Sequence, residues 1–178
     1  PELVVPDALG LPLTVQYDVL PVLLLNEKKK QQTTIEELKK DISIINAGVS
    51  GSTTSDGLDR LKWYLKKKPS IVFLALGAND GLRGLDIKQS QKNLEEIIKY
   101  AQESGAKVLL AGMLIPPNYG PEYSENFRKM YEEIKDKYKL KSMPFLLDQV
   151  AGNKNLNQSD GIHPNEQGHK TIAKNVFE

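Results

Sequence analysis

Residues 71–76 read IVFLAL, and residues 77–81, which follow directly, read GANDG. An unbroken apolar run of this length is typical of a strand that is covered on both faces, as the strands of a parallel sheet are. A glycine followed by small polar residues is typical of the turn after such a strand. The stretch therefore predicts a buried strand of a parallel sheet that ends in a polar loop.

The rest of the chain alternates between short apolar runs and longer amphipathic segments. In residues 90–105 the apolar positions recur three and four residues apart, and Gly105 ends the segment, which is typical of a helix. Besides residues 71–76, strands are predicted at residues 3–5, 42–45, 108–112 and 145–147. Helices are predicted at residues 18–30, 55–67, 87–104, 122–138 and from Asn165 to the end. This alternation predicts a parallel sheet with helices on both faces, in a single domain of residues 1–178.

Composition excludes several classes of function. The net charge is +1, from 24 Lys and Arg against 23 Asp and Glu, so there is no electrostatic case for nucleic-acid binding. The chain has no cysteine, which excludes disulfides, thiol nucleophiles and thiolate metal sites. No stretch approaches the roughly 20 apolar residues of a membrane span, and PELVVPDALG lacks the features of a signal peptide, so an exported protein would be in its mature form here. The phosphate-binding motifs GxGxxG and GxxxxGK[ST] are absent, which argues against a nucleotide or flavin binder.

Small and polar residues follow three of the predicted strands. They are NAGVSGSTT at residues 46–54, GANDG at residues 77–81 and MLIPPNYGPEY at residues 113–123. Each stretch alone is ordinary turn chemistry. Together they matter because ligand sites of parallel α/β sheets lie outside the carboxyl ends of the strands. Residues 113–123 are predicted to form a loop over the site, in which Tyr119 or Tyr123 either lines a pocket or packs the loop on the core.

A histidine and an aspartate lie close together near the C-terminus. Residues 158–165 read QSDGIHPN, which places Asp160 three residues before His163, one of the two histidines of the chain. A carboxylate that orients an imidazole base is one half of the chemistry of a serine hydrolase; the other half is a serine. The other histidine, His169, falls on the predicted last helix and is expected to be a surface or packing residue.

The blocks NAGVSGSTT, GANDG and DGIHPN, in this order, resemble the SGNH-hydrolase family, also called GDSL esterases and lipases. GANDGLRG, IPPNYGPEY and the ending DGIHP look most like its bacterial arylesterase, thioesterase and lysophospholipase branch. The resemblance runs from about residue 42 to the end of the chain. It implies a flavodoxin-like, three-layer α/β/α fold with a five-stranded parallel sheet. It also implies a serine-type carboxylic-ester hydrolase that acts on aryl or acyl esters, thioesters or lysophospholipids without a metal or cofactor.

The resemblance also implies roles for particular residues. His163 would be the general base and Asp160 its orienting partner, while Gly51 would supply a backbone N–H and Asn79 a side-chain amide to the oxyanion. Asp80 and Asn46 are expected to brace the loops. The implied partner is a small-molecule ester or thioester, with no nucleic acid and no stable membrane insertion. The resemblance does not indicate an oligomeric state. It does not fix a compartment either, but it favours the periplasm or secretion over the cytoplasm, since this branch is often periplasmic or secreted and sometimes cytoplasmic.

The match breaks at the nucleophile. The family's first block is Gly-Asp-Ser-Leu after a strand, whereas here the first apolar run is followed by Pro6, Asp7, Ala8 and Leu9. The stretch YDVLPVLLL at residues 17–25 is similar to the family's first helix, which supports the register. Ala8 therefore stands at the position of the nucleophilic serine, and the chain as written is predicted to be nearly inactive. The hydroxyl residues that could be considered as substitutes do not fit the family geometry; they are Ser50, Ser52, Thr53, Thr54 and Ser159.

Three explanations of Ala8 stay open. It is a deliberate serine-to-alanine change; or it is a genuine loss of activity that leaves a non-catalytic protein binding an acyl or glycan ester; or residues 1–41 depart from a natural sequence that carries Gly-Asp-Ser. Pro6 bears on the choice, because it fixes φ and lacks an N–H. It is a poor substitute for glycine where a chain turns sharply off a strand.

Overall fold

The computed structural model describes residues 43–177 of the chain. Ala8, the predicted strand at residues 3–5 and the predicted helix at residues 18–30 lie outside this part. The chain divides into two compact units, one of residues 1–50 with 147–178 and the other of Gly51–Leu146.

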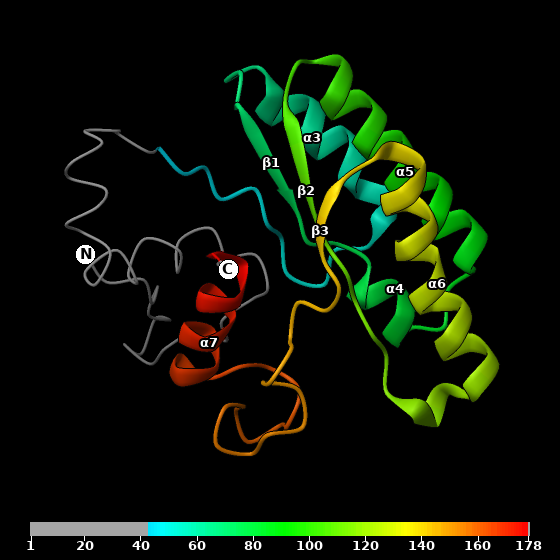
Figure 1. Cartoon of the computed structure of the whole chain (residues 1–178), viewed down its shortest axis with the longest axis vertical. Helices are drawn as coiled ribbons and strands as arrows, with labels where there is room; N and C mark the ends of the chain where they lie inside the picture. Colours follow the sequence, from blue (N-terminus) through cyan, green and yellow to red (C-terminus); the bar gives the residue numbers. More distant parts are fainter. Residues whose placement is uncertain (1–42, 178) are drawn as a thin grey trace. The chain divides into compact units, whose positions relative to one another are not determined.

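The unit Gly51–Leu146 is built on a parallel sheet (Figure 1). Its described strands are β1 (Ile71–Leu74), β2 (Lys107–Ala111) and β3 (Lys141–Met143), in the order β1-β2-β3. Ile71 is paired with Lys107, and Leu109 with Lys141. The predicted α/β class with a parallel sheet is confirmed.

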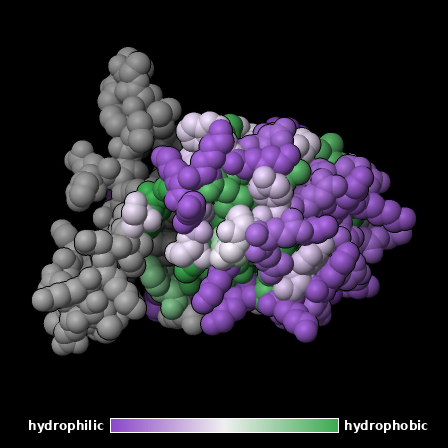
Figure 2. Space-filling model, turned by 90° about the horizontal axis from the view of Figure 1, so that it is seen from above, coloured by the Kyte–Doolittle hydropathy of each residue, from purple (hydrophilic) through white to green (hydrophobic). Residues whose placement is uncertain are grey.

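Helices of this unit cover one face of the sheet. The long ones are α3 (Gly57–Leu65), α5 (Ile87–Glu103) and α6 (Pro121–Tyr138), which lie side by side with α5 in the middle (Figure 1). The shorter ones are η2 (Thr54–Asp56), α4 (Ala78–Leu82) and η3 (Pro117–Tyr119). The outward surface of the long helices is mostly hydrophilic, as the right-hand side of Figure 2 shows.

The core of this unit lies between the long helices and the sheet. The apolar positions spaced three and four apart are all buried; they are Leu94, Ile97, Ile98 and Ala101 on α5, and Phe127, Met130, Tyr131 and Ile134 on α6. Helix α5 begins after Asp86, whose carboxylate accepts the backbone N–H of Gln89 at 2.7 Å. It ends before Gly105, which has φ of 89°. The predicted amphipathic patterns of both helices are therefore confirmed.

Two predicted strands differ from the structure. Residues 145–147 form a turn, and β3 lies earlier in the chain, because Pro144 has no N–H with which to continue a ladder. Residues 43–45 pair with none of the described strands. A strand needs a partner, and an apolar run does not by itself supply one. The described part of the sheet therefore has three strands, where five were predicted.

The predicted strand at residues 71–76 also differs in detail. Strand β1 ends at Leu74, and Ile71 at its start is exposed. Because Ile71 is 60% exposed, the predicted coverage of both faces is wrong for the beginning of the run. The residues GANDG, predicted to be a loop, form the start of helix α4.

The described part of the other unit contains the helix α7 (Glu166–Phe177). The Asn165 side chain caps it by accepting the backbone N–H groups of Gln167 and Gly168 at 3.0 and 3.1 Å. Ile172 and Ala173 of α7 are fully buried. None of the helices described in residues 43–177 is long and apolar enough to cross a membrane.

Candidate active site

The end of strand β1 leads through a glycine into the short helix α4. Gly77 has φ of 112°, in the left-handed region that glycine adopts without strain. A Cβ at this position would also collide with the hydroxyl of Tyr131, so the residue has to be small. The tight passage puts Asn79 and Asp80 on the first turn of α4, directly after the strand.

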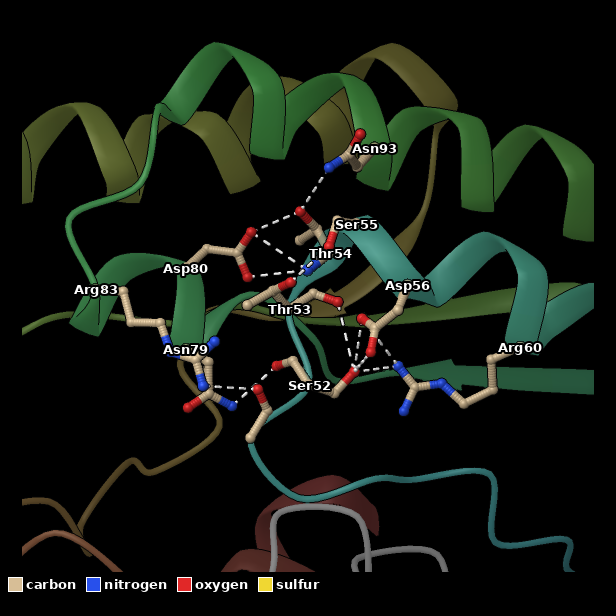
Figure 3. Close-up of polar contacts among 11 residues, drawn as sticks. Ser52, Thr53, Thr54, Ser55, Asp56, Arg60, Asn79, Asp80, Arg83 and Asn93 are labelled. Atoms are coloured by element: carbon tan, nitrogen blue, oxygen red, sulfur yellow. Dashed lines mark hydrogen bonds and ion pairs between the residues drawn. The ribbon is translucent and has the colours of Figure 1, made fainter.

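Asn79 joins α4 to the loop that carries Gly51. Its side-chain Nδ2 donates a hydrogen bond to the carbonyl oxygen of Ser52 at 2.9 Å (Figure 3). Gly51 has φ of 69°, again a conformation suited to glycine. Its carbonyl oxygen accepts a hydrogen bond from Arg83 at 2.9 Å. The structure thus brings Asn79 and the Gly51 loop together, as expected for two parts of one site.

A buried carboxylate anchors the same loop from the other side. Asp80 is 2% exposed, and its oxygens accept the backbone N–H of Thr54 at 2.9 Å and the Thr54 hydroxyl at 2.6 Å (Figure 3). Ser90 of α5 donates to Asp80 at 3.0 Å, and Asn93 of the same helix donates to the Thr54 hydroxyl at 2.9 Å. These donors stabilise the carboxylate away from water. Asp80 therefore braces the loop, as expected from the sequence.

The hydroxyl groups of this loop are engaged with partners other than histidine. Ser52 donates to Asp56 at 2.9 Å and accepts a hydrogen bond from Arg60. The Thr54 hydroxyl is held by Asp80 and Asn93 as described. An activated serine needs an adjacent base. The contacts of Ser52 and Thr54 therefore agree with the prediction that neither of them is a catalytic nucleophile.

The second group of predicted residues lies in a tight loop of the other unit. The Asp160 carboxylate lies 2.7 Å from Nδ1 of His163, and its other oxygen accepts the backbone N–H groups of Ile162 and His163 at 2.9 and 3.0 Å. Gly161, with φ of 72°, allows the turn between them. A hydrogen bond of 2.8 Å from the N–H of Gln158 to the His163 carbonyl closes the loop. The carboxylate and the imidazole are thus held together by local backbone geometry.

The electrostatics of this loop favour a charged carboxylate. The N–H of His163, then that of Ile162, then the His163 side chain lower the pKa of Asp160 to about 2. An ionised carboxylate can only accept, so Nδ1 of His163 is the donor and its proton is assigned to that nitrogen. The remaining ring nitrogen, Nε2, is then the basic one. This is the tautomer that a general base requires.

The tyrosines of residues 113–123 pack the loop through their hydroxyl groups. Tyr119 donates to the carbonyl oxygen of Leu82 and Tyr123 to that of Leu85, both at 2.8 Å. Of the two expectations for these tyrosines, the contacts favour the one in which they fix the loop. They do so on both sides of Arg83.

The sequence predicts no role for three residues that hold the loop, Arg83, Thr54 and Asn93. Arg83 follows Asn79 by four residues, a spacing that puts two side chains on one side of a helical turn. That spacing in GANDGLRG is a signal that could have found it. Nothing in the local sequence links Thr54 to Asn93, because they come together only when η2 packs on α5. Within residues 43–177, no three His, Asp or Glu side chains are grouped so that they could hold a metal ion.

The second histidine is buried in helix α7. His169 on α7 is 1% exposed, and neither ring nitrogen has a hydrogen-bond partner among the described residues. Burial lowers the pKa of His169 to about 4, although the nearby Pro164 carbonyl offsets part of the effect. The packing role expected for His169 is confirmed.

This burial predicts a loss of stability in mild acid. Between about pH 6.5 and pH 4 the unfolded chain binds a proton at position 169 that the folded chain does not, so the free energy of unfolding should fall by about 3 kcal/mol over this range. Urea unfolding at a series of pH values measures it. His169→Phe should remove this part of the pH dependence and leave the loss that comes from Asp160 below about pH 4. Equal slopes in the two proteins between pH 6.5 and 4 would contradict the assignment.

Known proteins share both the sequence and the fold of this chain. Esterase TesA of Pseudomonas aeruginosa is 42% identical over 138 residues, which are 77% of this chain and 69% of TesA. Thioesterase 1/protease 1/lysophospholipase L1 of Escherichia coli is 35% identical over 151 residues, which are 84% of this chain and 68% of that protein. The structure of the psychrotrophic esterase EstA from Pseudoalteromonas, inhibited by monoethylphosphonate, has a TM-score of 0.77 and 36% identity, covering 87% of this chain and 81% of EstA.

The names of these relatives are those of an esterase, of a thioesterase and lysophospholipase, and of a second esterase. The GDSL-like lipase/acylhydrolase family model matches residues 29–171. That range contains both groups of polar residues and the sheet between them along the chain. This chain therefore belongs to the GDSL-like lipase/acylhydrolase family.

Proposed function

We propose that this protein is a serine-type carboxylic-ester hydrolase of the SGNH type, which needs a serine at position 8 for turnover. The observation that carries the proposal is the Asp160–His163 pair, in which a carboxylate oxygen and the ring Nδ1 lie 2.7 Å apart. The substrates would be aryl or acyl esters, thioesters or lysophospholipids, in line with the names of the relatives. The full fold would be the three-layer α/β/α arrangement with a five-stranded parallel sheet.

In the proposed reaction the hydroxyl oxygen of a serine at position 8 attacks the ester carbonyl carbon. His163 takes the hydroxyl proton at Nε2, and Asp160 stabilises the imidazolium. When the tetrahedral intermediate collapses, the alcohol or thiol leaves with that proton. Water then hydrolyses the acyl-enzyme by the same route and releases the acid. The reaction needs no metal and no cofactor.

Two donors of the described loop suit the oxyanion of this intermediate. The N–H of Gly51 has no hydrogen-bond partner among residues 43–177. Asn79 has two hydrogens on Nδ2, and the bond to Ser52 uses one of them. We propose that the Gly51 N–H and the second hydrogen of Asn79 hold the oxyanion. Donors fixed in advance in this way lower the barrier, because they do not have to reorganise during the reaction.

A fluorophosphonate probe tests the proposal directly, because it labels a serine only when that serine is activated. The chain as written should show no mass increase after incubation with the probe. Ala8→Ser, and the double variant Pro6→Gly with Ala8→Ser in which glycine frees the turn, should each gain one adduct at position 8. The inhibition of EstA by monoethylphosphonate supports this choice of reagent.

Two results of the labelling would contradict the proposal. An adduct on the chain as written, mapped to Ser52 or Ser159, would mean that the nucleophile lies elsewhere. Failure of both serine variants to label would favour the second candidate, a non-catalytic protein that binds an acyl or glycan ester. Ala8 itself favours that candidate, because a methyl group cannot attack a carbonyl. Binding of 4-nitrophenyl butyrate by the chain as written, without turnover in the serine variants, would then support it.

A further inference from the structure

Successive peptide groups of the Gly51 loop are held by side chains from residues 79–83. Arg83 donates to the carbonyl oxygen of Gly51, in the peptide between Gly51 and Ser52. Asn79 donates to the carbonyl oxygen of Ser52, in the next peptide. Asp80 accepts the N–H of Thr54, in the peptide after that. Helix α4 and the residue that follows it thus fix three consecutive peptide planes of the loop (Figure 3).

The peptide before these three carries the N–H of Gly51. No described residue bonds to this N–H, so its direction depends on the backbone conformation of Gly51 itself. Glycine adopts positive and negative φ with similar ease, and Gly51 has φ of 69°. The hydrogen bond from Arg83 to the Gly51 carbonyl helps to select this conformation. Without a partner for that carbonyl, the loop would be free to present the N–H in other directions. The contact from Arg83 is therefore placed where it controls a proposed oxyanion donor.

Arg83 is itself held in place by its neighbours in the chain. The hydroxyl groups of Tyr119 and Tyr123 donate to the carbonyl oxygens of Leu82 and Leu85, so the backbone is fixed on each side of Arg83. In the part of the chain that the structure describes, no carboxylate lies within ion-pair distance of its guanidinium. Its described polar contact is the one to Gly51. Arg83 is exposed, and among residues 43–177 its guanidinium bonds to the Gly51 carbonyl rather than to a carboxylate.

We propose that Arg83 is a positioning residue of the oxyanion hole, which acts on the reaction through the carbonyl of Gly51. This inference rests on the proposed function of the Gly51 N–H. Arg83 does not touch the substrate in this proposal; it keeps the donor aimed at the place where the oxyanion develops. A misdirected donor binds the oxyanion more weakly in the transition state, and its binding of the substrate changes little, so kcat falls.

Kinetics of Ala8→Ser protein separate this role from a structural one. Arg83→Met has similar length but no hydrogen-bond donor, and it should lower kcat by about 10- to 100-fold with little change in KM, less than the roughly 100- to 1,000-fold cost of deleting an oxyanion donor. Arg83→Lys keeps one donor and should recover part of the loss. The matched control is Arg128→Met, which removes an arginine paired with Glu125 and Glu132 on α6. It should leave kcat unchanged.

Amide NMR of the chain as written tests the same inference without turnover. Arg83→Met should shift or broaden the resonances of Gly51 and Ser52, and Arg128→Met should not. Unchanged Gly51 and Ser52 resonances, or equal losses of kcat in the two arginine variants, would overturn the role of Arg83. If Ala8→Ser with Arg83 intact has no activity, the proposed function fails instead, and the NMR comparison still decides whether Arg83 positions the loop.

Discussion

His163→Ala, made in the Ala8→Ser protein, should lower kcat for 4-nitrophenyl butyrate by about a million-fold, to the level of the chain as written. The reason is that a serine hydroxyl is a weak nucleophile until a base takes its proton, and the Nε2 atom of His163 is the proposed base. The effects of losing the serine and of losing the histidine should therefore not add, because each loss abolishes the same step. The chain as written with His163→Ala lacks both groups, and its turnover should match that of a protein that lacks only one of them.

The second histidine provides a matched control for this experiment. His169 is buried in α7, and its pKa of about 4 keeps it neutral at the pH of the assay. His169→Phe should therefore leave kcat within a few-fold of the parent at pH 8, while it changes the acid stability as predicted above. A comparable fall in kcat from both substitutions would mean that the loss reflects damage to the unit that contains them, and the general-base role of His163 would be wrong.

The helices were predictable from the sequence because their information is local. The apolar spacing of α5, its cap at Asp86 and its end before Gly105 all lie within the segment itself. Strands were less predictable, since a strand is defined by its partner. Residues 43–45 and 145–147 are more apolar than β3, yet Pro144 and the available pairing decide which residues join the described sheet.

The contacts of the candidate site also divide into local ones, which could be predicted from the sequence, and long-range ones, which could not. Asp160 and His163 are three residues apart, so their contact could be predicted from one short stretch. The contacts that hold the Gly51 loop join residues 26 to 39 positions apart, as in the bonds from Thr54 to Asp80 and from Asn93 to Thr54. Which side chains meet there depends on how α4 leaves β1, and GANDG looked like a loop. The family resemblance was enough to predict Gly51 and Asn79 as site residues. The residues that hold them could be identified only from the fold.

Asp160→Asn in the Ala8→Ser protein should lower kcat by about 10,000-fold while the fold stays intact. The asparagine oxygen can keep the two backbone N–H bonds from Ile162 and His163, which turns its NH₂ group toward Nδ1 of His163. Nδ1 must then accept, so the ring proton moves to Nε2, the atom that has to take the proton of the nucleophile. The substitution therefore removes the base without removing the imidazole.

The pH dependence of this pair sharpens the test. Because the pKa of Asp160 is lowered to about 2, the carboxylate is charged throughout the range in which an esterase is assayed, and its own protonation should appear in no acid limb above about pH 3. Raising the pH should not rescue Asp160→Asn. Asp148→Asn changes an exposed aspartate of the same unit and should keep full activity. Recovery of the Asp160→Asn variant at high pH would show that the carboxylate contributes charge alone, and the orienting role assigned to it would be wrong.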